Sequence, residues 1–173
     1  EGVIVRAIMG AGKSHLLTEL VACHRPPRTH SQRRGRRRWT HEAIVVSPST
    51  KRLVQQLSQD LRVRLGKAAV GTFWAQRKDT QTQVIVVCND SMPSLARELE
   101  KIKRPVSLLV ADECHRTQCP TYLEAYERIQ PQRLVGFTAP PYRAHENVAL
   151  SLFTREVYSY GASQALADQV VVP

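Results

Sequence analysis

The sequence predicts an α/β fold in which a parallel β-sheet is covered by helices on both faces. Two observations carry this prediction. First, short apolar runs rich in β-branched residues alternate along the chain with longer amphipathic segments. Second, these runs are apolar without a gap, which is typical of strands that are buried on both faces of a parallel sheet. The length of 173 residues suits one domain of this kind.

Five runs are predicted to be strands, and each ends close to a polar or glycine-containing motif. They are 3–8, 43–46, 84–87, 106–111 and 133–137. Three segments between them are predicted to be helices: 13–23, 50–65 and 91–102. The second helix shows the clearest period, because Leu53, Leu57, Leu61 and Leu65 recur four residues apart. Ligands of such sheets bind at the carboxyl ends of the strands, where these polar motifs fall.

Composition limits the class of protein. The chain is 42% hydrophobic and 23% charged, which excludes a disordered chain, a collagen and a coiled coil. No apolar run reaches the length of about 18 residues that a membrane span needs, and no signal peptide precedes the first strand. We therefore expect a cytoplasmic protein with no membrane partner, whose four cysteines are reduced thiols. The first residue is Glu1, so we expect the chain to be part of a longer protein.

The positive charge is concentrated in one segment. The formal net charge is +10, and the segment 24–41 contains seven arginines and no acid. We interpret it as a basic insertion loop within the single domain 1–173. Because it connects the first helix to the second strand, it should leave the amino edge of the sheet. A solvated insertion, an auxiliary DNA contact and a protein interface all remain open for it.

The strongest motif is a glycine-containing loop between the first strand and the first helix. It runs from Ala7 to Ser14 with the sequence A-I-M-G-A-G-K-S. Glycines let backbone N–H groups approach phosphate oxygens, and the following helix N-terminus adds partial positive charge. We expect Lys13 to reach the β- and γ-phosphates of a nucleotide and the Ser14 hydroxyl to bind Mg²⁺. The predicted phosphate-binding residues are Met9, Gly10, Ala11, Gly12, Lys13 and Ser14.

A pair of carboxylates follows the apolar run 106–111. Adjacent carboxylates at a buried strand end are costly unless a cation neutralises them, and beside a phosphate loop that cation is the Mg²⁺ of ATP. We expect Asp112 to hold the metal and Glu113 to orient and deprotonate the attacking water. An alternative for such a pair on its own is a helix cap followed by a surface acid. Metal binding by Cys114, His115 and Cys119 is not expected, because their spacing does not match known ligand patterns.

In their order, these motifs resemble the superfamily 2 helicases and translocases, in the DEAD/DEAH-like branch with a D-E-x-H motif. The resemblance spans nearly the whole chain and is greatest to DNA-directed translocase subunits of restriction and repair systems. The segments that carry it are 7–14 (motif I), 46–50 (motif Ia), 84–91 (motif Ib), 112–115 (motif II) and 137–141 (motif III), followed by a tail, 152–173, similar to the connection to a second domain. Pro140 departs from motif III, in which a second hydroxyl residue commonly stands at this position. Thr138 is therefore the one hydroxyl residue of the segment 137–141.

The resemblance implies a RecA-like P-loop domain that binds Mg-ATP and hydrolyses it to move along nucleic acid, DNA rather than RNA. It implies a catalytic role for His115 and Thr138, which would link the nucleotide site to motif III. It places Ser49, Thr50 and Ser91 against the phosphodiester backbone, although ordinary helix capping explains these residues as well. Motifs IV to VI do not occur in the chain, so a second RecA-like domain is expected in the full-length protein, and the isolated chain should turn over little ATP.

Two other functions fit part of this pattern. One is a P-loop NTPase that does not act on nucleic acid, and the other is a nucleic-acid-binding module with little ATPase activity of its own. Trp39 and Trp74 belong to no motif and are assigned to packing. The topology gives a test of the whole interpretation: Lys13 and Asp112 should meet at one edge of the sheet, with Thr138 beside them.

Overall fold

A computed structural model of the chain describes residues 2–8, 10–24, 42–117, 119–139 and 152–170. Its centre is one eight-stranded sheet with the strand order β4-β3-β5-β2-β6-β7-β1-β8. All neighbouring strands are parallel except β3 and β4, which form an antiparallel hairpin. The strands are β1 (Gly2–Ala7), β2 (Ala43–Ser47), β3 (Val70–Trp74), β4 (Arg77–Lys78), β5 (Val84–Val87), β6 (Val106–Asp112), β7 (Leu134–Thr138) and β8 (Phe153–Tyr160).

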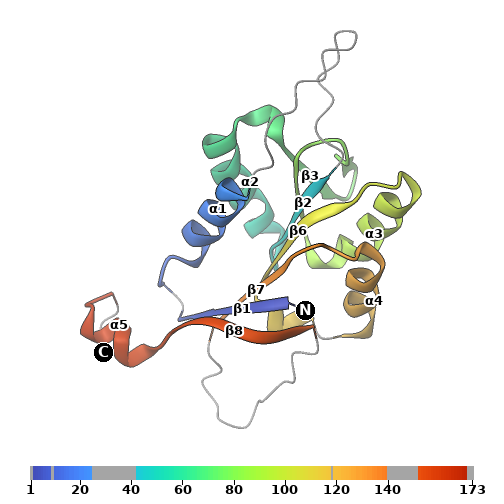
Figure 1. The fold of residues 1–173 in the computed structure, drawn as a ribbon. Helices are drawn as coiled ribbons and strands as arrows, with labels where there is room; N and C mark the ends of the chain where they lie inside the picture. Colours follow the sequence, from blue (N-terminus) through green and yellow to red (C-terminus); the bar gives the residue numbers. More distant parts are fainter. Residues whose placement is uncertain (1, 9, 25–41, 118, 140–151, 171–173) are drawn as a thin grey trace.

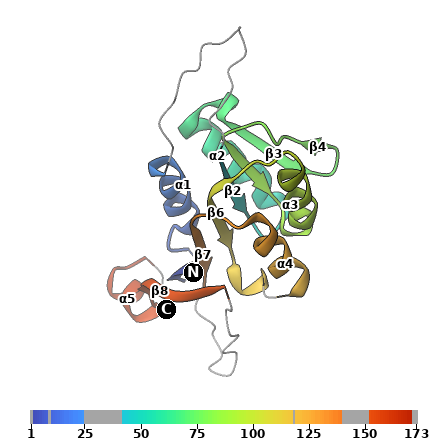
Figure 2. The same cartoon turned by 45° about the vertical axis from the view of Figure 1, so that its right-hand side comes forward.

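Helices cover both faces of this sheet, as the sequence predicts (Figure 1). One face is covered by α1 and α2, and the opposite face by α3 and α4, which Figure 2 shows after a turn of the molecule. The α-helices are α1 (Lys13–Cys23), α2 (Lys51–Leu65), α3 (Met92–Lys101), α4 (Pro120–Ile129) and α5 (Ala162–Ala167). Short 3-10 helices lie between a strand and an α-helix at three places in the described chain: η1 (Lys67–Ala69), η2 (Asn89–Ser91) and η3 (Cys114–Thr117). None of the helices described is long and apolar enough to cross a membrane.

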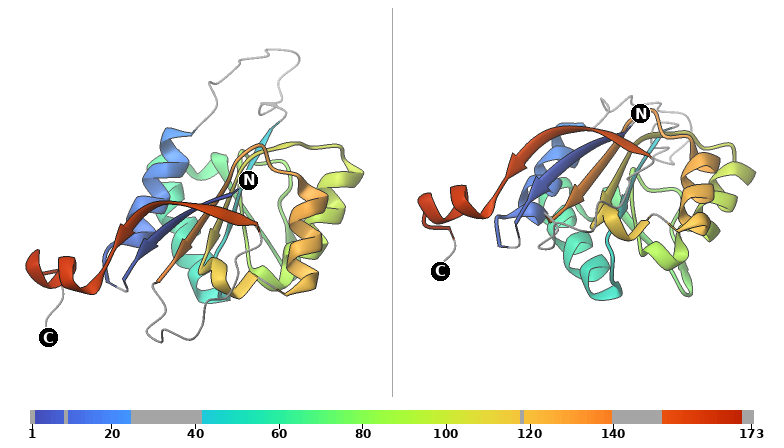
Figure 3. Two further views of the ribbon diagram at one scale, coloured as in Figure 1. Left: turned by 60° about the horizontal axis from the view of Figure 1, so that its bottom comes forward. Right: turned by 90° about the horizontal axis from the view of Figure 1, so that it is seen from below.

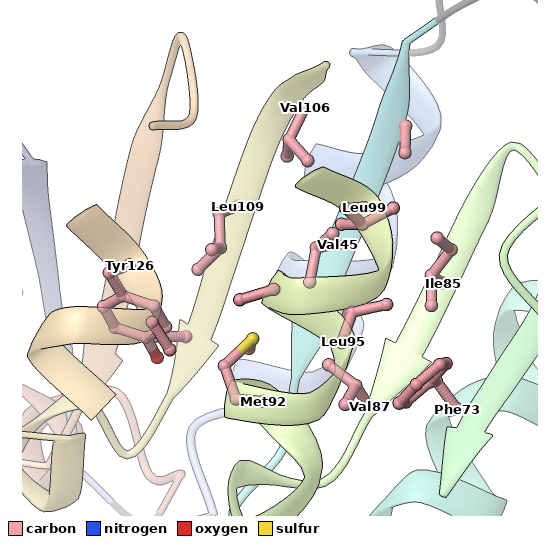
Figure 4. Packing of buried hydrophobic residues seen from close by; sticks show 14 of the residues in the cluster. Val45, Phe73, Ile85, Val87, Met92, Leu95, Leu99, Val106, Leu109 and Tyr126 are labelled. Atoms are coloured by element: carbon pink, nitrogen blue, oxygen red, sulfur yellow. The ribbon is translucent and has the colours of Figure 1, made fainter. Parts of the chain in front are cut away.

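Two apolar clusters, one on each face of the sheet, hold these layers together. Figure 4 shows α3 lying over the central strands, and Met92, Leu95 and Leu99 of this helix belong to the same buried cluster as Val45 and Ile85. On the other face, the leucines of α2 that recur four residues apart are buried, with the exception of the half-buried Leu53. The strands β2 and β5 are buried along their whole length, which explains why their sequences contain no polar alternation.

The carboxyl-terminal part of the described chain extends the sheet beyond β1. Strand β8 runs parallel to β1 as an edge strand, and α5 projects from its end (Figure 3). Only Phe153 of β8 is buried, and its ring packs in the cluster on the α3–α4 face. The tail that resembles a connection between domains therefore begins as a strand of this sheet.

The α/β fold with a parallel sheet is confirmed, and each of the five predicted strands and three predicted helices is present within one or two residues of its expected bounds. The β3–β4 hairpin, α4, β8 and α5 have no counterpart among the predicted elements. The basic segment from 25 to 41 lies outside the described residues. Its flanking residues are placed at the amino edge of the sheet, since His24 contacts Ser107 near the start of β6 (Nε2 to Oγ, 3.2 Å), and Glu42 precedes β2.

Candidate nucleotide-binding site

The loop between β1 and α1 has the geometry of an open cradle. Gly10 and Gly12 have positive φ angles of 86° and 76°, a conformation that glycine adopts without strain. A Cβ atom built on either residue meets nothing within 4 Å, so the space before the loop is open. Helix α1 begins at Lys13 without a side-chain cap, which leaves the first N–H groups of the helix available to an anion. The other two predicted phosphate-binding residues of this loop are Met9 and Ala11. Of these, Met9 lies outside the described residues.

Lys13 joins this loop to the carboxylates at the end of β6. Its Nζ donates a hydrogen bond to the backbone oxygen of Ala7 (3.2 Å) and lies 3.4 Å from Oε1 of Glu113. The side chains of Lys13 and Glu113 are 12% and 21% exposed, so this ion pair is screened less than one on the open surface. The strand order explains the contact, because β7 alone separates β1 from β6 and all three strands are parallel.

Asp112 occupies the last position of β6, where the strand leaves the core. Burial of the carboxyl group and the negative charge of Glu113 raise its pKa above the usual value, and the charge of Lys13 partly opposes this effect. Asp112 and Ser14 also line the same small pocket, between α1, α2 and the end of β6. The two predicted metal ligands therefore face one space.

Glu113 stands at a sharp turn immediately after β6. Its φ angle is +51°, an uncommon conformation for a residue other than glycine. Its Oε2 atom is buried, has no hydrogen-bond partner among the described residues and lies 3.4 Å from Nδ1 of His115. That ring nitrogen is 2.9 Å from the hydroxyl of Thr138, at the end of β7. Motifs I, II and III are thus connected from Lys13 through Glu113 and His115 to Thr138.

The three residues predicted to contact nucleic acid lie at the same carboxyl edge, next to the site just described. Ser49 and Thr50 follow β2, and Ser91 follows β5, the parallel neighbour of β2. The Thr50 hydroxyl accepts a hydrogen bond from the backbone N–H of Leu53 (3.3 Å) and caps α2, whereas Ser91 makes no such side-chain bond to α3. A contact that the sequence analysis missed ties these two loops together, because the Ser47 hydroxyl donates to the buried Asn89 amide oxygen. No sequence pattern pointed to this pair, since 42 positions separate the two residues.

Comparison of the sequence with known families gives one match that spans most of the chain. Residues 1–143 match the family described as type III restriction enzyme, res subunit. The chain belongs to this family. Membership agrees with the resemblance to superfamily 2 helicases and translocases. A search of curated proteins found no match.

Solved structures show the same fold at low sequence identity. The helicase domain of Hef from Pyrococcus furiosus matches 96% of this chain with a TM-score of 0.67 and 18% identity. The UvsW helicase of bacteriophage T4 matches 91% of it with a TM-score of 0.62 and 12% identity. The SWI2/SNF2 ATPase core of Sulfolobus solfataricus, solved in complex with double-stranded DNA, matches 81% with a TM-score of 0.56 and 14% identity.

The match covers only part of each of these proteins. This chain corresponds to 36% of the Hef structure, 54% of the UvsW structure and 28% of the SWI2/SNF2 structure. Together with the strand order, these likenesses confirm the predicted RecA-like P-loop fold.

Proposed function

We propose that this chain is the ATP-binding half of a DNA helicase or translocase motor that couples Mg-ATP hydrolysis to movement along the nucleic acid. The observation that carries the proposal is the meeting of Lys13, Asp112 and Glu113 at one edge of the sheet, 3.4 Å apart for the Lys13–Glu113 pair. This contact joins the glycine loop to the carboxylates, which is the arrangement that phosphoryl transfer requires.

The residues present fit a nucleotide with its metal ion. The open space before Gly10 and Gly12 and the uncapped start of α1 suit phosphate oxygens. Ser14 and Asp112 would hold Mg²⁺, and a nearby cation would favour the ionised form of the buried Asp112 carboxyl. When bound, Mg²⁺ neutralises the charge that develops on the phosphate oxygens.

Each remaining residue has a part in hydrolysis that follows from its position. Lys13 neutralises phosphate oxygens after leaving Glu113, and Oε1 of Glu113, which Lys13 then frees, accepts the proton of an attacking water. His115 and Thr138 hold the opposite side of Glu113 and transmit its position to the loop after β7. Gly10, Ala11 and Gly12 would present backbone N–H groups to the phosphates, and Met9, outside the described residues, stays a predicted member of this loop.

The nucleic-acid backbone would pass over the loops that carry Ser49, Thr50 and Ser91. Since the Thr50 hydroxyl caps α2, this residue would reach a phosphate through its backbone N–H, whereas the Ser49 and Ser91 hydroxyls have no such commitment to a cap. Proteins of this class complete their ATP site with arginines from a second RecA-like domain, and such arginines contribute about 10³- to 10⁵-fold in rate. The second domain would belong to the longer protein.

The first test is nucleotide binding by the chain as it stands. A fluorescent ATP analogue should bind in the presence of Mg²⁺, and Lys13→Ala should reduce the affinity at least about tenfold, which corresponds to about 1.4 kcal/mol. Lys101→Ala is the matched control, because Lys101 is an exposed residue at the end of α3. Equal binding by the Lys13 variant and the wild type would contradict the assignment of the phosphate loop.

The second test concerns the coupling to nucleic acid. ATP hydrolysis by the longer protein should rise when DNA is added, and Glu113→Gln should abolish that rise without weakening nucleotide binding. An ATPase activity that DNA and RNA leave unchanged would favour a P-loop NTPase acting on another substrate.

A further inference from the structure

A groove lies between α2 and the β3–β4 hairpin, apart from the nucleotide-binding residues. Its volume is about 460 Å³, within the range of about 300–1,000 Å³ that small-molecule pockets occupy. The residues that give it its chemical character are Gln55, Gln59 and Arg62 on α2, Thr72 and Trp74 on β3, and Arg77 on β4.

Secondary-structure geometry puts these side chains on facing surfaces. Gln55 and Gln59 are four residues apart on α2, and Arg62 follows three residues later, so the three lie along one side of the helix. Thr72 and Trp74 are two residues apart on β3 and share one face of the strand. That face is the one covered by α1 and α2, since Val70 and Trp74 both pack with the cluster on that side.

The groove is positively charged. It is lined by two arginines and by no acidic residue. Within the described part of the chain, neither Arg62 nor Arg77 forms an ion pair with a carboxylate, whereas the exposed Arg64 on the same helix pairs with Glu19. Arg62 Nε donates instead to the backbone oxygen of Val70 (3.4 Å), a contact that fixes the guanidinium beside the groove.

Thr72 and Trp74 each present a group to the groove that a ligand could contact. The Thr72 side chain is 3% exposed, and its hydroxyl has no hydrogen-bond partner among the described residues. Leaving a buried hydroxyl unpaired is unfavourable, so a polar group that enters the groove would gain a hydrogen bond from it. Trp74 is half-buried, so part of its indole faces the groove while the rest packs against the core.

The register of the sheet places the groove beside the loops proposed to carry nucleic acid. Phe73 pairs with Val87 at the end of β5, so Trp74 lies at the carboxyl edge, level with the start of the loop to Ser91. Helix α2, which forms one wall of the groove, begins directly after Thr50. A strand that passes over Ser49 and Ser91 would therefore run close to Trp74.

We propose that this groove binds unpaired nucleotides of a nucleic-acid strand, with the Trp74 indole stacked on a base and Arg62 and Arg77 in contact with the flanking phosphates. The Thr72 hydroxyl then finds its missing partner on the strand. This inference rests on the proposed function, and it adds a base-stacking contact to a path that otherwise consists of backbone contacts. Stacking on an aromatic side chain is insensitive to base identity, as a motor that moves along any sequence requires.

Tryptophan fluorescence reports on the contact directly. The chain has two tryptophans, so Trp39→Phe leaves Trp74 as the single reporter. Titration of this variant with a short single-stranded oligothymidylate should quench its emission. Binding through the basic segment 25–41 alone would leave Trp74 unquenched.

Affinity measurements with a labelled oligothymidylate then separate the roles of the residues. Trp74→Ala should weaken binding about five- to hundredfold, and Trp74→Phe should retain most of the affinity. Arg62→Gln and Arg77→Gln should each lower the slope of log affinity against log salt concentration by about 0.7. Arg64→Gln is the matched control on α2, because Arg64 pairs with Glu19 and does not line the groove. Unchanged Mg-ATP binding and melting temperature would show that each variant is folded.

The possible results distinguish this inference from the function on which it rests. If the oligonucleotide binds but leaves Trp74 unquenched, and the Trp74 and arginine variants bind like the wild type, the groove is not part of the path and the proposed function stands. If neither single-stranded nor double-stranded DNA nor RNA binds, although Mg-ATP does, the nucleic-acid function itself is wrong. Binding of duplex DNA alone, with no effect of Trp74→Ala, would also overturn the groove proposal.

Discussion

Gly136 in β7 is predicted to be a position where even one added methyl group destabilises the fold and disturbs the nucleotide site. A Cβ atom there would lie 2.7 Å from the sulfur of Cys114 and 2.8 Å from two ring atoms of Phe153. Both neighbours are buried, so neither can move away freely. Burial also raises the pKa of the Cys114 thiol to about 12, so this sulfur is an uncharged packing atom directly after Asp112 and Glu113.

The expected cost of Gly136→Ala follows from this crowding. Inserting a methyl group into a well-packed core costs about 1–3 kcal/mol. For a chain of this size, each kcal/mol lowers the melting temperature by about 2–4 °C, so a cost of about 2 kcal/mol gives a decrease of about 4–8 °C. Because Cys114 must shift, the carboxylates before it should shift as well, and Mg-ATP affinity should fall in parallel.

Thermal unfolding followed by circular dichroism measures this effect, with Gly161→Ala as the control. Nothing lies within 4 Å of a Cβ built on Gly161, and its φ angle of −86° suits any residue, so its replacement should change stability by less than about 0.5 kcal/mol. Phe153→Leu removes the ring from the crowded space, and combined with Gly136→Ala it should cost less than the sum of the two single variants. Strict additivity, or a wild-type melting temperature for Gly136→Ala, would refute the reasoning.

Three further predictions concern the edge that carries the site. Thr50→Ala should destabilise the chain by about 1 kcal/mol in denaturant unfolding, because it removes the cap of α2, and Thr50→Ser should restore most of it. The raised pKa of Asp112 means that its charged form opposes folding. The free energy of unfolding should therefore fall as the pH rises from the unfolded-state pKa of this carboxyl through its folded-state pKa. Asp112→Asn should melt at a higher temperature than the wild type at neutral pH without nucleotide. Glu113→Gln should bind ATP up to about tenfold more tightly in equilibrium titration, because Lys13 no longer has to leave a carboxylate; Glu124→Gln, which alters an exposed pair with Arg128, should leave ATP affinity unchanged.

The sequence predicted most of the sheet because buried parallel strands leave an unmistakable pattern. Strands such as β5 consist of apolar residues only, and the packing of helices on both faces demands this. The edge strands were missed for the opposite reason. Strand β8 is exposed along most of its length, so no hydrophobic period marks it, and its place is fixed by backbone pairing with β1. Strand β3, next to the edge strand β4, was missed for a different reason. Its apolar run is interrupted by Gly71, where Asp79 and Thr82 lie so close that a Cβ would be 2.5 Å from each.

The candidate site shows a similar division between what topology determines and what local geometry determines. That Lys13 and Asp112 lie at one edge follows from parallel strands joined by right-handed crossovers, and the structure has this arrangement. The contact between Lys13 and Glu113, however, depends on the left-handed turn at Glu113, and the bond between His115 and Thr138 depends on the 3-10 helix that follows it. Neither conformation could be predicted from the sequence. Glutamate rarely adopts a positive φ angle, so the residue type at position 113 does not indicate the turn.

The arrangement of these charges bears on how such a motor would respond to its ligand. Lys13 is shared between the Ala7 carbonyl and Glu113, so a phosphate that attracts Lys13 must release Glu113 at the same time. Among the described residues, the released carboxylate then faces His115 on its other side, and through it the Thr138 hydroxyl. Phosphate binding would therefore strengthen the contact between Glu113 and His115. The negative charge of Glu113 would then act mainly on the loop after β7. A change at the phosphate loop would then reach motif III through side-chain contacts at the carboxyl edge, each of 3.4 Å or less.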